Sequence, residues 1–210
     1  ACLVMGTGVL YYLPVLIISG TVAGVPPASA HEHPTPTERA APGVVYVEAR
    51  AEVEALGAKA VAVAADVGDP TDVERVAAAA LTAFDRVDVL VNNASELGPT
   101  PMPYLLDTDP DALRRVLDVN LLGPFLLTRA LLGPMLAAGR GSVINVSSDA
   151  GVVGYPGWGA YGVSKAALDQ MTRIWASELD GSGVRVNSVD PGDMATAMHA
   201  AALPDDDPAT

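Results

Sequence analysis

A chain of 210 residues with 50% hydrophobic and 18% charged residues is long and apolar enough to bury the core of one domain. Its formal net charge of −13 argues against a nucleic-acid partner or an anionic membrane, because both need a basic face. The single cysteine, Cys2, excludes an internal disulfide and any zinc site built on several cysteines. It also fits a reducing compartment, so we expect a cytoplasmic protein.

The N-terminal segment can be interpreted in two ways. Residues 3–25 carry no charge, and Ala28-Ser29-Ala30 has the small-x-small form of a signal-peptidase site. A secretory leader also begins with a positive segment, however, and the first basic residue of this chain is Arg39. We therefore prefer a buried first strand that starts at Val15 and leads into a phosphate-binding loop by Gly24.

From Val44 onward, apolar runs typical of strands alternate with segments of helical periodicity. Strands are predicted over residues 44–47, 60–64, 87–91, 142–146 and 185–189. Helices are predicted over residues 49–57, 70–84, 110–121 and 166–179. Asp69-Pro70 and Asp109-Pro110 each place a capping carboxylate before a proline at the first helical position. This alternation predicts a single α/β domain over residues 1–210 with a doubly wound parallel sheet, a Rossmann-like fold.

Residues 26–43 interrupt this pattern. The segment contains five prolines and no hydrophobic periodicity, where a fold of this type should have a helix. Proline lacks the backbone N–H group and restricts the residue before it. We expect an irregular insert here.

The strongest chemical signal is Tyr161 with Lys165 in the sequence "YGVSK". A spacing of four places both side chains on one face of a helix. An ammonium group beside a phenol lowers the phenol pKa toward neutrality, which makes a general acid and base for a carbonyl and its alcohol. An ordinary surface pair would have the same spacing, so the assignment depends on neighbouring motifs.

Two such motifs lie at the ends of predicted strands, and a third feature lies on a predicted helix. Ser148 lies thirteen residues before Tyr161 at the end of a strand, where ligands meet parallel sheets, and Ser147 is the rival hydroxyl. The sequence "NNAS" ends the preceding strand. Asn120 lies on the apolar face of its helix, where a buried amide needs partners. Pro124 cannot donate a hydrogen bond to the Asn120 carbonyl.

With these residues the chain resembles the short-chain dehydrogenase/reductase family from about Gly57 to its end. The motifs Asp66-Val67, "NNAS" in place of the family's NNAG, "NVSSDAG", "YGVSK" and "DPGDMAT" occur in order at family spacings. The resemblance implies that Asn120, Ser148, Tyr161 and Lys165 are the catalytic residues. It further implies that Ser19, Gly20, Gly24, Glu48, Asp66, Val67, Asn93, Ala94, Tyr161, Lys165, Pro191, Gly192 and Thr196 bind NAD or NADP.

The resemblance is imperfect at both ends. Residues 19–26 are a degenerate copy of the family's glycine loop, with Pro26 in place of the last glycine. At the C-terminus we expect the family's final strand to be missing. His31-Glu32-His33 has no third ligand nearby in sequence and indicates loop rather than a metal site, so no metal is predicted.

Two functions follow as hypotheses. The first is an NAD(P)-dependent oxidoreductase that acts on a small carbonyl or secondary alcohol, with Tyr161 as general acid and base and no nucleic-acid or membrane partner. The alternative is a non-catalytic protein of the same fold with impaired cofactor binding. Glu48 could accept from a ribose 2′-hydroxyl, which favours NAD, whereas Arg50 could pair with the 2′-phosphate of NADP. Family members are expected to form homodimers or homotetramers.

Overall fold

The computed structural model describes residues 2–3, 16–18, 53–55, 57–194 and 196–204. Within these residues five strands form one sheet in the order β1 (Cys2–Leu3), β2 (Leu16–Ile18), β3 (Val89–Asn92), β4 (Gly141–Val146) and β5 (Val184–Val189). Strands β3, β4 and β5 are parallel, so their carboxyl ends meet at one edge of the sheet. The predicted α/β fold with a parallel sheet is confirmed for this part of the chain.

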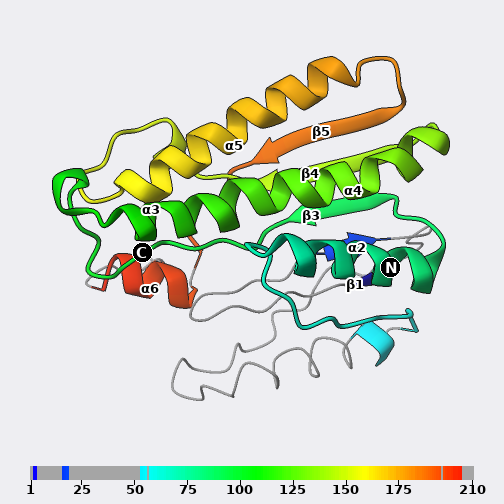
Figure 1. The fold of residues 1–210 in the computed structure, drawn as a ribbon, viewed down its shortest axis with the longest axis horizontal. Helices are drawn as coiled ribbons and strands as arrows, with labels where there is room; N and C mark the ends of the chain where they lie inside the picture. Colours follow the sequence, from blue (N-terminus) through cyan, green and yellow to red (C-terminus); the bar gives the residue numbers. More distant parts are fainter. Residues whose placement is uncertain (1, 4–15, 19–52, 56, 195, 205–210) are drawn as a thin grey trace.

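Helices connect the parallel strands and lie side by side along the sheet (Figure 1). The helices are α2 (Pro70–Phe84), α3 (Pro110–Leu117), α4 (Gly123–Ala137), α5 (Gly159–Glu178) and α6 (Ala197–Ala202), and a π-helical turn, η2 (Asp118–Leu122), joins α3 to α4. The predicted caps are present: Asp69 accepts from the Thr71 N–H at 2.8 Å, and Asp109 accepts from the Asp111 N–H at 2.7 Å. Each cap satisfies an N–H group that the first helical turn leaves without a partner.

The main core lies between the sheet and helices α2 and α4. Leu90 of β3, Val143 of β4, and Leu127 and Leu131 of α4 are each at most 1% exposed to solvent. Their alternation along the strands follows the period of two that a sheet imposes. On β5 the exposed Arg185 alternates with buried valines, as expected for a strand with one face on the core.

A chain of buried polar side chains links the parallel strands to α5. The Asn92 Nδ2 group donates to the Asn145 Oδ1 atom at 2.8 Å, and the Asn145 Nδ2 group donates to the Thr172 Oγ1 atom at 2.8 Å. The Thr172 hydroxyl donates to the Leu168 carbonyl at 2.8 Å. These side chains are at most 4% exposed, so each depends on the next for its hydrogen bonds.

The predicted strand over residues 60–64 is wrong. The segment makes no ladder with a neighbouring strand among the described residues, and side chains of α2 satisfy backbone groups beside it. Arg75 donates to the Ala64 carbonyl at 2.6 Å, and Asp72 accepts from the Asp66 N–H at 2.7 Å. Alternating apolar residues indicate burial, but a strand also needs a partner for its backbone groups.

The N-terminal strand is present but runs in the opposite direction from the one that a wholly parallel sheet requires. Residues 16–18 form β2, and Leu16 pairs with Val91 in an antiparallel ladder with β3. The predicted phosphate loop after Ile18, the insert over residues 26–43 and the strand over residues 44–47 lie outside the described residues. Of the helix predicted over residues 49–57, residues 53–55 are described and helical.

The helix that carries Tyr161 begins earlier than predicted. The periodicity placed its start at Ala166, whereas α5 starts at Gly159. In the part of α5 that was predicted, the apolar side chain of Leu168 is buried. In the first two turns of the helix the buried side chains include the polar Ser164 and Lys165. Hydrophobic periodicity alone cannot detect a helical face whose buried residues are polar.

The helical stretch Pro110–Ala137 is 28 residues long and apolar enough, by length and composition, to cross a membrane. A core helix meets the same criteria, and 44% of its most apolar window is buried in this fold. Its contacts with α2 and β4 describe a helix packed inside an α/β layer.

Candidate active site

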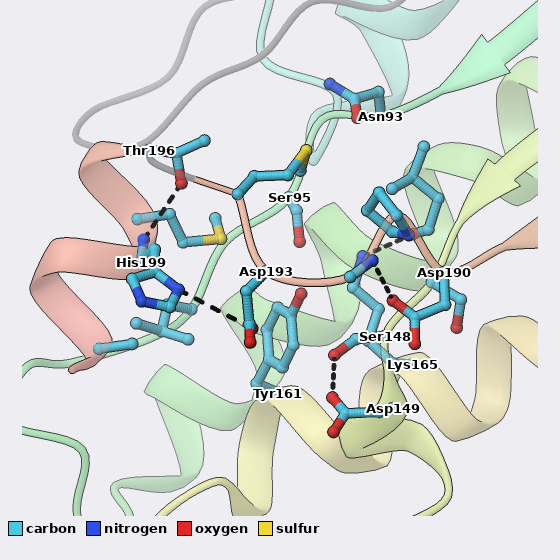
Figure 2. A pocket seen from close by; sticks show the side chains of 18 of the residues that line it. Asn93, Ser95, Ser148, Asp149, Tyr161, Lys165, Asp190, Asp193, Thr196 and His199 are labelled. Atoms are coloured by element: carbon cyan, nitrogen blue, oxygen red, sulfur yellow. Dashed lines mark hydrogen bonds and ion pairs between the residues drawn. The ribbon is translucent and has the colours of Figure 1, made fainter. Parts of the chain in front are cut away.

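A pocket of about 350 Å³ lies where the carboxyl ends of β3, β4 and β5 meet. Figure 2 shows that its side chains come from the segments after these strands, from α5 and from the region around α6. Of the predicted site residues, the pocket brings together Asn93, Ser148, Tyr161, Lys165, Pro191, Gly192 and Thr196. The carboxyl edge of a parallel sheet is where open α/β folds bind ligands.

Tyr161 and Lys165 lie one turn apart on α5 and are 8% and 2% exposed. The Lys165 Nζ group donates to the Val146 carbonyl of β4 at 2.8 Å and lies 5.3 Å from the centroid of the Tyr161 ring. The Tyr161 phenol oxygen points into the pocket (Figure 2). The pair is therefore held by the helix and by the end of β4.

Burial raises the pKa of the Tyr161 phenol above its usual value, and nearby Asp190 and Asp149 raise it further. Hydrogen bonds with Ser95 and Ser148 act in the opposite direction. The prediction that Lys165 lowers this pKa toward neutrality is thus wrong for this structure, because burial dominates and the Lys165 amine is directed at the Val146 carbonyl. Burial also lowers the pKa of Lys165 to about 8, with Asp169 opposing that change.

Ser148 lies at the start of the turn η3 (Asp149–Gly151), beside the phenol. Its hydroxyl donates to the Asp149 Oδ1 atom at 3.1 Å and accepts from the Ala150 N–H at 3.2 Å. The Tyr155 hydroxyl donates to the other oxygen of Asp149 at 2.7 Å, and this bond is the main cause that lowers the pKa of Asp149. Asp149 was not predicted as a site residue, and no spacing rule indicated it.

Close glycine contacts fix the turn η3 against α5. A Cβ atom on Gly162 of α5 would lie 2.6 Å from the Ala150 carbonyl oxygen. A Cβ atom on Gly151 of η3 would lie 2.9 Å from the Ala166 backbone nitrogen of α5. Both positions require glycine for this approach. The reciprocal contact sets the position of Ser148, which precedes the turn, relative to Tyr161.

Asn120 is 1% exposed and lies in the π-helical turn η2, behind the pocket rather than in its wall. Its amide nitrogen donates to the Glu96 carbonyl at 2.8 Å and to the Ser164 hydroxyl at 2.9 Å. Its amide oxygen accepts from the Glu96 N–H at 2.7 Å and from the Ser95 hydroxyl at 3.3 Å. The buried amide that the sequence predicted is fully partnered, and it joins the segment after β3 to α5 through Ser164.

Asp66 and Val67 lie away from this pocket. The guanidinium of Arg115 donates to both oxygens of Asp66, at 2.8 Å and 3.1 Å, and to Glu96 at 2.9 Å. Arg115 was not predicted, and it connects Asp66 to the backbone segment that holds Asn120. Val67 is 4% exposed and packs closely on the backbone at Gly123, and Ala94 is 7% exposed.

The segment after β5 closes the other side of the pocket. Gly192 has a φ of 70°, in the left-handed region that favours glycine, and its N–H donates to the Asp190 carboxylate at 3.0 Å. The Thr196 hydroxyl caps α6 by accepting from the His199 N–H at 3.2 Å. Asp193 lies 4.0 Å from the His199 ring nitrogen. The predicted residues Ser19, Gly20, Gly24 and Glu48 lie outside the described residues.

Comparison with known proteins explains this arrangement. The family model "short chain dehydrogenase" matches residues 44–207. This chain belongs to the short-chain dehydrogenase family. It is 41% identical over 150 residues to 2-(R)-hydroxypropyl-CoM dehydrogenase of Xanthobacter autotrophicus, covering 71% of this chain and 60% of that protein.

Two solved oxidoreductase structures share the fold with sequence identities above 30%. NAD+-bound xylitol dehydrogenase matches with a TM-score of 0.66 and 32% identity, over 70% of this chain and 55% of that one. A metagenomic short-chain oxidoreductase in complex with NADP matches with a TM-score of 0.65 and 35% identity, over 70% of this chain and 65% of that one. This chain spans 60% of the length of the Xanthobacter relative.

The family implies a nicotinamide cofactor, and the described residues fit its nicotinamide half. The Ser147 hydroxyl is buried, lines the pocket and has no hydrogen-bond partner among the residues that the structure describes. Asn93 and Lys165 place an amide and an amine in the same wall. An unpartnered buried hydroxyl beside such donors suits a polar ligand. Among the described residues, no group of three or more His, Cys, Asp or Glu side chains is arranged to hold a metal ion.

Proposed function

We propose that the protein is an NAD(P)-dependent oxidoreductase that interconverts a carbonyl and a secondary alcohol. One observation carries the proposal: Tyr161 and Lys165 on α5 and Ser148 after β4 face one pocket at the carboxyl edge of the parallel sheet. Asn120 lies directly behind it and is joined to it through Ser95. The names of the relatives, dehydrogenases and reductases, support the same activity, and they give no support to a non-catalytic alternative.

When bound, the nicotinamide would supply or accept the hydride. Tyr161 donates its phenol proton to the carbonyl oxygen as the alcohol forms, and it accepts that proton in the reverse direction. Ser148 orients the same oxygen through its hydroxyl. Lys165 would hold the nicotinamide ribose, with its amine positioned by the Val146 carbonyl. The backbone carbonyl of Asn120 would bind a water that connects Lys165 to solvent.

The pocket wall favours a neutral substrate. Leu97, Trp158 and Met198 form an apolar part of the wall, while Asp149 and Asp193 contribute negative charge. Carboxylates repel an anionic substrate at close range. We therefore propose a small neutral ketone, aldehyde or secondary alcohol as the substrate class.

Cofactor preference is proposed from the sequence. Glu48 favours NAD through the ribose 2′-hydroxyl, and Arg50 is the competing residue for NADP. Titration with NADH and NADPH, followed by quenching of the fluorescence of Trp158 in the pocket wall, decides between them. Tighter NADPH binding that is lost in Arg50→Ala would reverse the preference.

The cellular location and the oligomeric assembly of the protein are also proposed. We propose a cytoplasmic homodimer or homotetramer, from the single cysteine and from the family resemblance. Light scattering at micromolar protein concentration measures the molar mass, and a monomer would contradict the assembly.

The activity is tested with Tyr161→Phe. This change removes the phenol proton and keeps the ring, so turnover should fall by about 10² to 10⁴ while cofactor affinity changes little. The assay follows NAD(P)H absorbance with a panel of neutral ketones and secondary alcohols. Unchanged turnover in Tyr161→Phe would remove the basis of the proposed mechanism.

A further inference from the structure

Ser95 places an additional hydroxyl group beside the phenol of Tyr161. It occupies the position where the family motif NNAG has glycine, in the segment that follows β3. The side chain is 8% exposed, lines the pocket, and lies next to the Tyr161 phenol oxygen in Figure 2. This nearby hydroxyl acts to lower the pKa of Tyr161, against the effect of burial.

The Ser95 hydroxyl has only one hydrogen to donate and two acceptors within reach. In the structure it donates to the Asn120 Oδ1 atom at 3.3 Å, which is long for a hydroxyl donor. Asn120 does not depend on this bond, because its oxygen already accepts from the Glu96 N–H at 2.7 Å. The hydrogen can therefore leave Asn120 without leaving a buried acceptor unpaired.

The acceptor that gains from this hydrogen is the ionised phenol. A neutral Tyr161 can donate its own hydrogen to the Ser95 oxygen, whereas a phenolate can only accept. Hydrogen bonds to an ionised oxygen are roughly twice as strong as neutral ones. Ionisation of Tyr161 thus favours rotation of the Ser95 hydroxyl from Asn120 to the phenolate.

We propose that Ser95 is a positioning residue that stabilises the phenolate of Tyr161 by switching its hydrogen from Asn120 to the phenol oxygen. The proposal deepens the proposed function, since it concerns the residue assigned there as general acid and base. Ser148 also lies beside the phenol, but its hydroxyl donates to the Asp149 carboxylate, so turning it to the phenolate would take a hydrogen from a charged acceptor. The Ser95 hydroxyl acts through Tyr161 and leaves the substrate oxygen to Ser148.

The test measures the ionisation of Tyr161 directly, so it does not depend on turnover. Protein labelled with ¹³C at the tyrosine Cζ position is titrated by NMR, and the resonance of Tyr161 is assigned by its loss in Tyr161→Phe. In Ser95→Ala and Ser95→Gly the midpoint for Tyr161 should move to higher pH by about one unit, the size expected for one lost hydrogen bond to a charged group. Ser142→Ala, which removes a half-buried hydroxyl at the opposite end of β4, should leave the midpoint unchanged.

The kinetic readout separates this proposal from the proposed function. The limb of the alcohol-oxidation pH profile that reports Tyr161 should move in Ser95→Ala by the same amount as the NMR midpoint. Below that limb the rate should fall about tenfold, since one pH unit is a factor of ten in phenolate. An unchanged midpoint in both Ser95 variants would overturn the role of Ser95 while the activity stands. Failure of Tyr161→Phe to reduce turnover would instead overturn the proposed mechanism, whatever the titration shows.

Discussion

Gly162 of α5 faces the carbonyl oxygen of Ala150 so closely that a Cβ atom at Gly162 would lie 2.6 Å from it. The contact joins the helix that carries Tyr161 to the turn that follows Ser148. The obstacle is backbone, so it cannot move aside as the end of a flexible side chain could. The separation of the two hydroxyl groups therefore depends on a residue that has no side chain.

Gly162→Ala should reduce both stability and turnover. We expect a loss of about 1–3 kcal/mol in the free energy of unfolding, the usual cost of overpacking, and a lower kcat because η3 is pushed away from α5. Denaturant unfolding and steady-state kinetics measure the two effects. Gly154→Ala is the matched control, because nothing lies within 4 Å of its Cβ position. Equal behaviour of the two variants would show that the contact has no structural role.

The buried amine of Lys165 should make stability depend on pH. Its pKa falls from 10.5 in the unfolded chain to about 8 in the fold, so between these values the folded protein binds fewer protons than the unfolded chain. Stability should therefore rise with pH across this window. Relative to Lys165→Met, wild-type protein should gain about 3 kcal/mol between pH 8 and pH 10.5. A difference between the two proteins that is constant with pH would contradict the lowered pKa.

Asn145→Ala should destabilise the protein strongly. The change removes the acceptor for Asn92 and the donor to Thr172, and both of these partners are buried. Thr172 keeps its bond to the Leu168 carbonyl and Asn92 keeps a long bond of 3.4 Å to the Thr128 hydroxyl, so the loss consists of two hydrogen bonds and the cavity left by the side chain. A total of about 2–4 kcal/mol is expected in urea unfolding. Asn187→Ala on the exposed face of β5 serves as the control and should change stability by less than about 0.5 kcal/mol.

Arg115→Met should cost more stability than Arg114→Met. Arg115 bonds two carboxylates and its side chain is 34% exposed, whereas Arg114 is 69% exposed and pairs with a single, largely exposed Asp111. We expect about 1–2 kcal/mol for Arg115→Met after allowance for solvent screening, and less than about 0.5 kcal/mol for Arg114→Met. Thermal unfolding at low and high salt measures both. Equal losses of stability in the two variants would mean that the ion pairs of Arg115 with Asp66 and Glu96 do not contribute to the free energy of unfolding.

Elements with strong local signals could be predicted from the sequence. The capped helices after Asp69 and Asp109 form as expected, and the strands predicted over residues 87–91, 142–146 and 185–189 are present as β3, β4 and β5. The failures involve partners distant in sequence. Residues 60–64 have the apolar pattern of a strand, but they make no ladder with another strand among the described residues. The direction of β2 is set by its antiparallel ladder with β3 and not by its own residues.

The candidate site shows the same division. Spacing placed Tyr161 and Lys165 on one helical face, and Ser148 beside them. The sign of the Tyr161 pKa shift could not be predicted, because it depends on how deeply the ring is buried and on where the Lys165 amine points. The pairing of Arg115 with Asp66 joins residues 49 positions apart, and no local pattern reports such a contact.

The amide pair between β3 and β4 also selects the alignment of the two strands. Asn92 and Asn145 are direct partners in the parallel ladder. A slip of one residue would turn one of the two amides to the opposite face of the sheet, since side chains alternate along a strand. Apolar neighbours such as Leu90 and Val143 would tolerate other apolar partners after such a slip, but an amide enclosed by them would not. The two asparagines thus distinguish one register from its neighbours during folding, in a sheet whose remaining core contacts are interchangeable hydrocarbon.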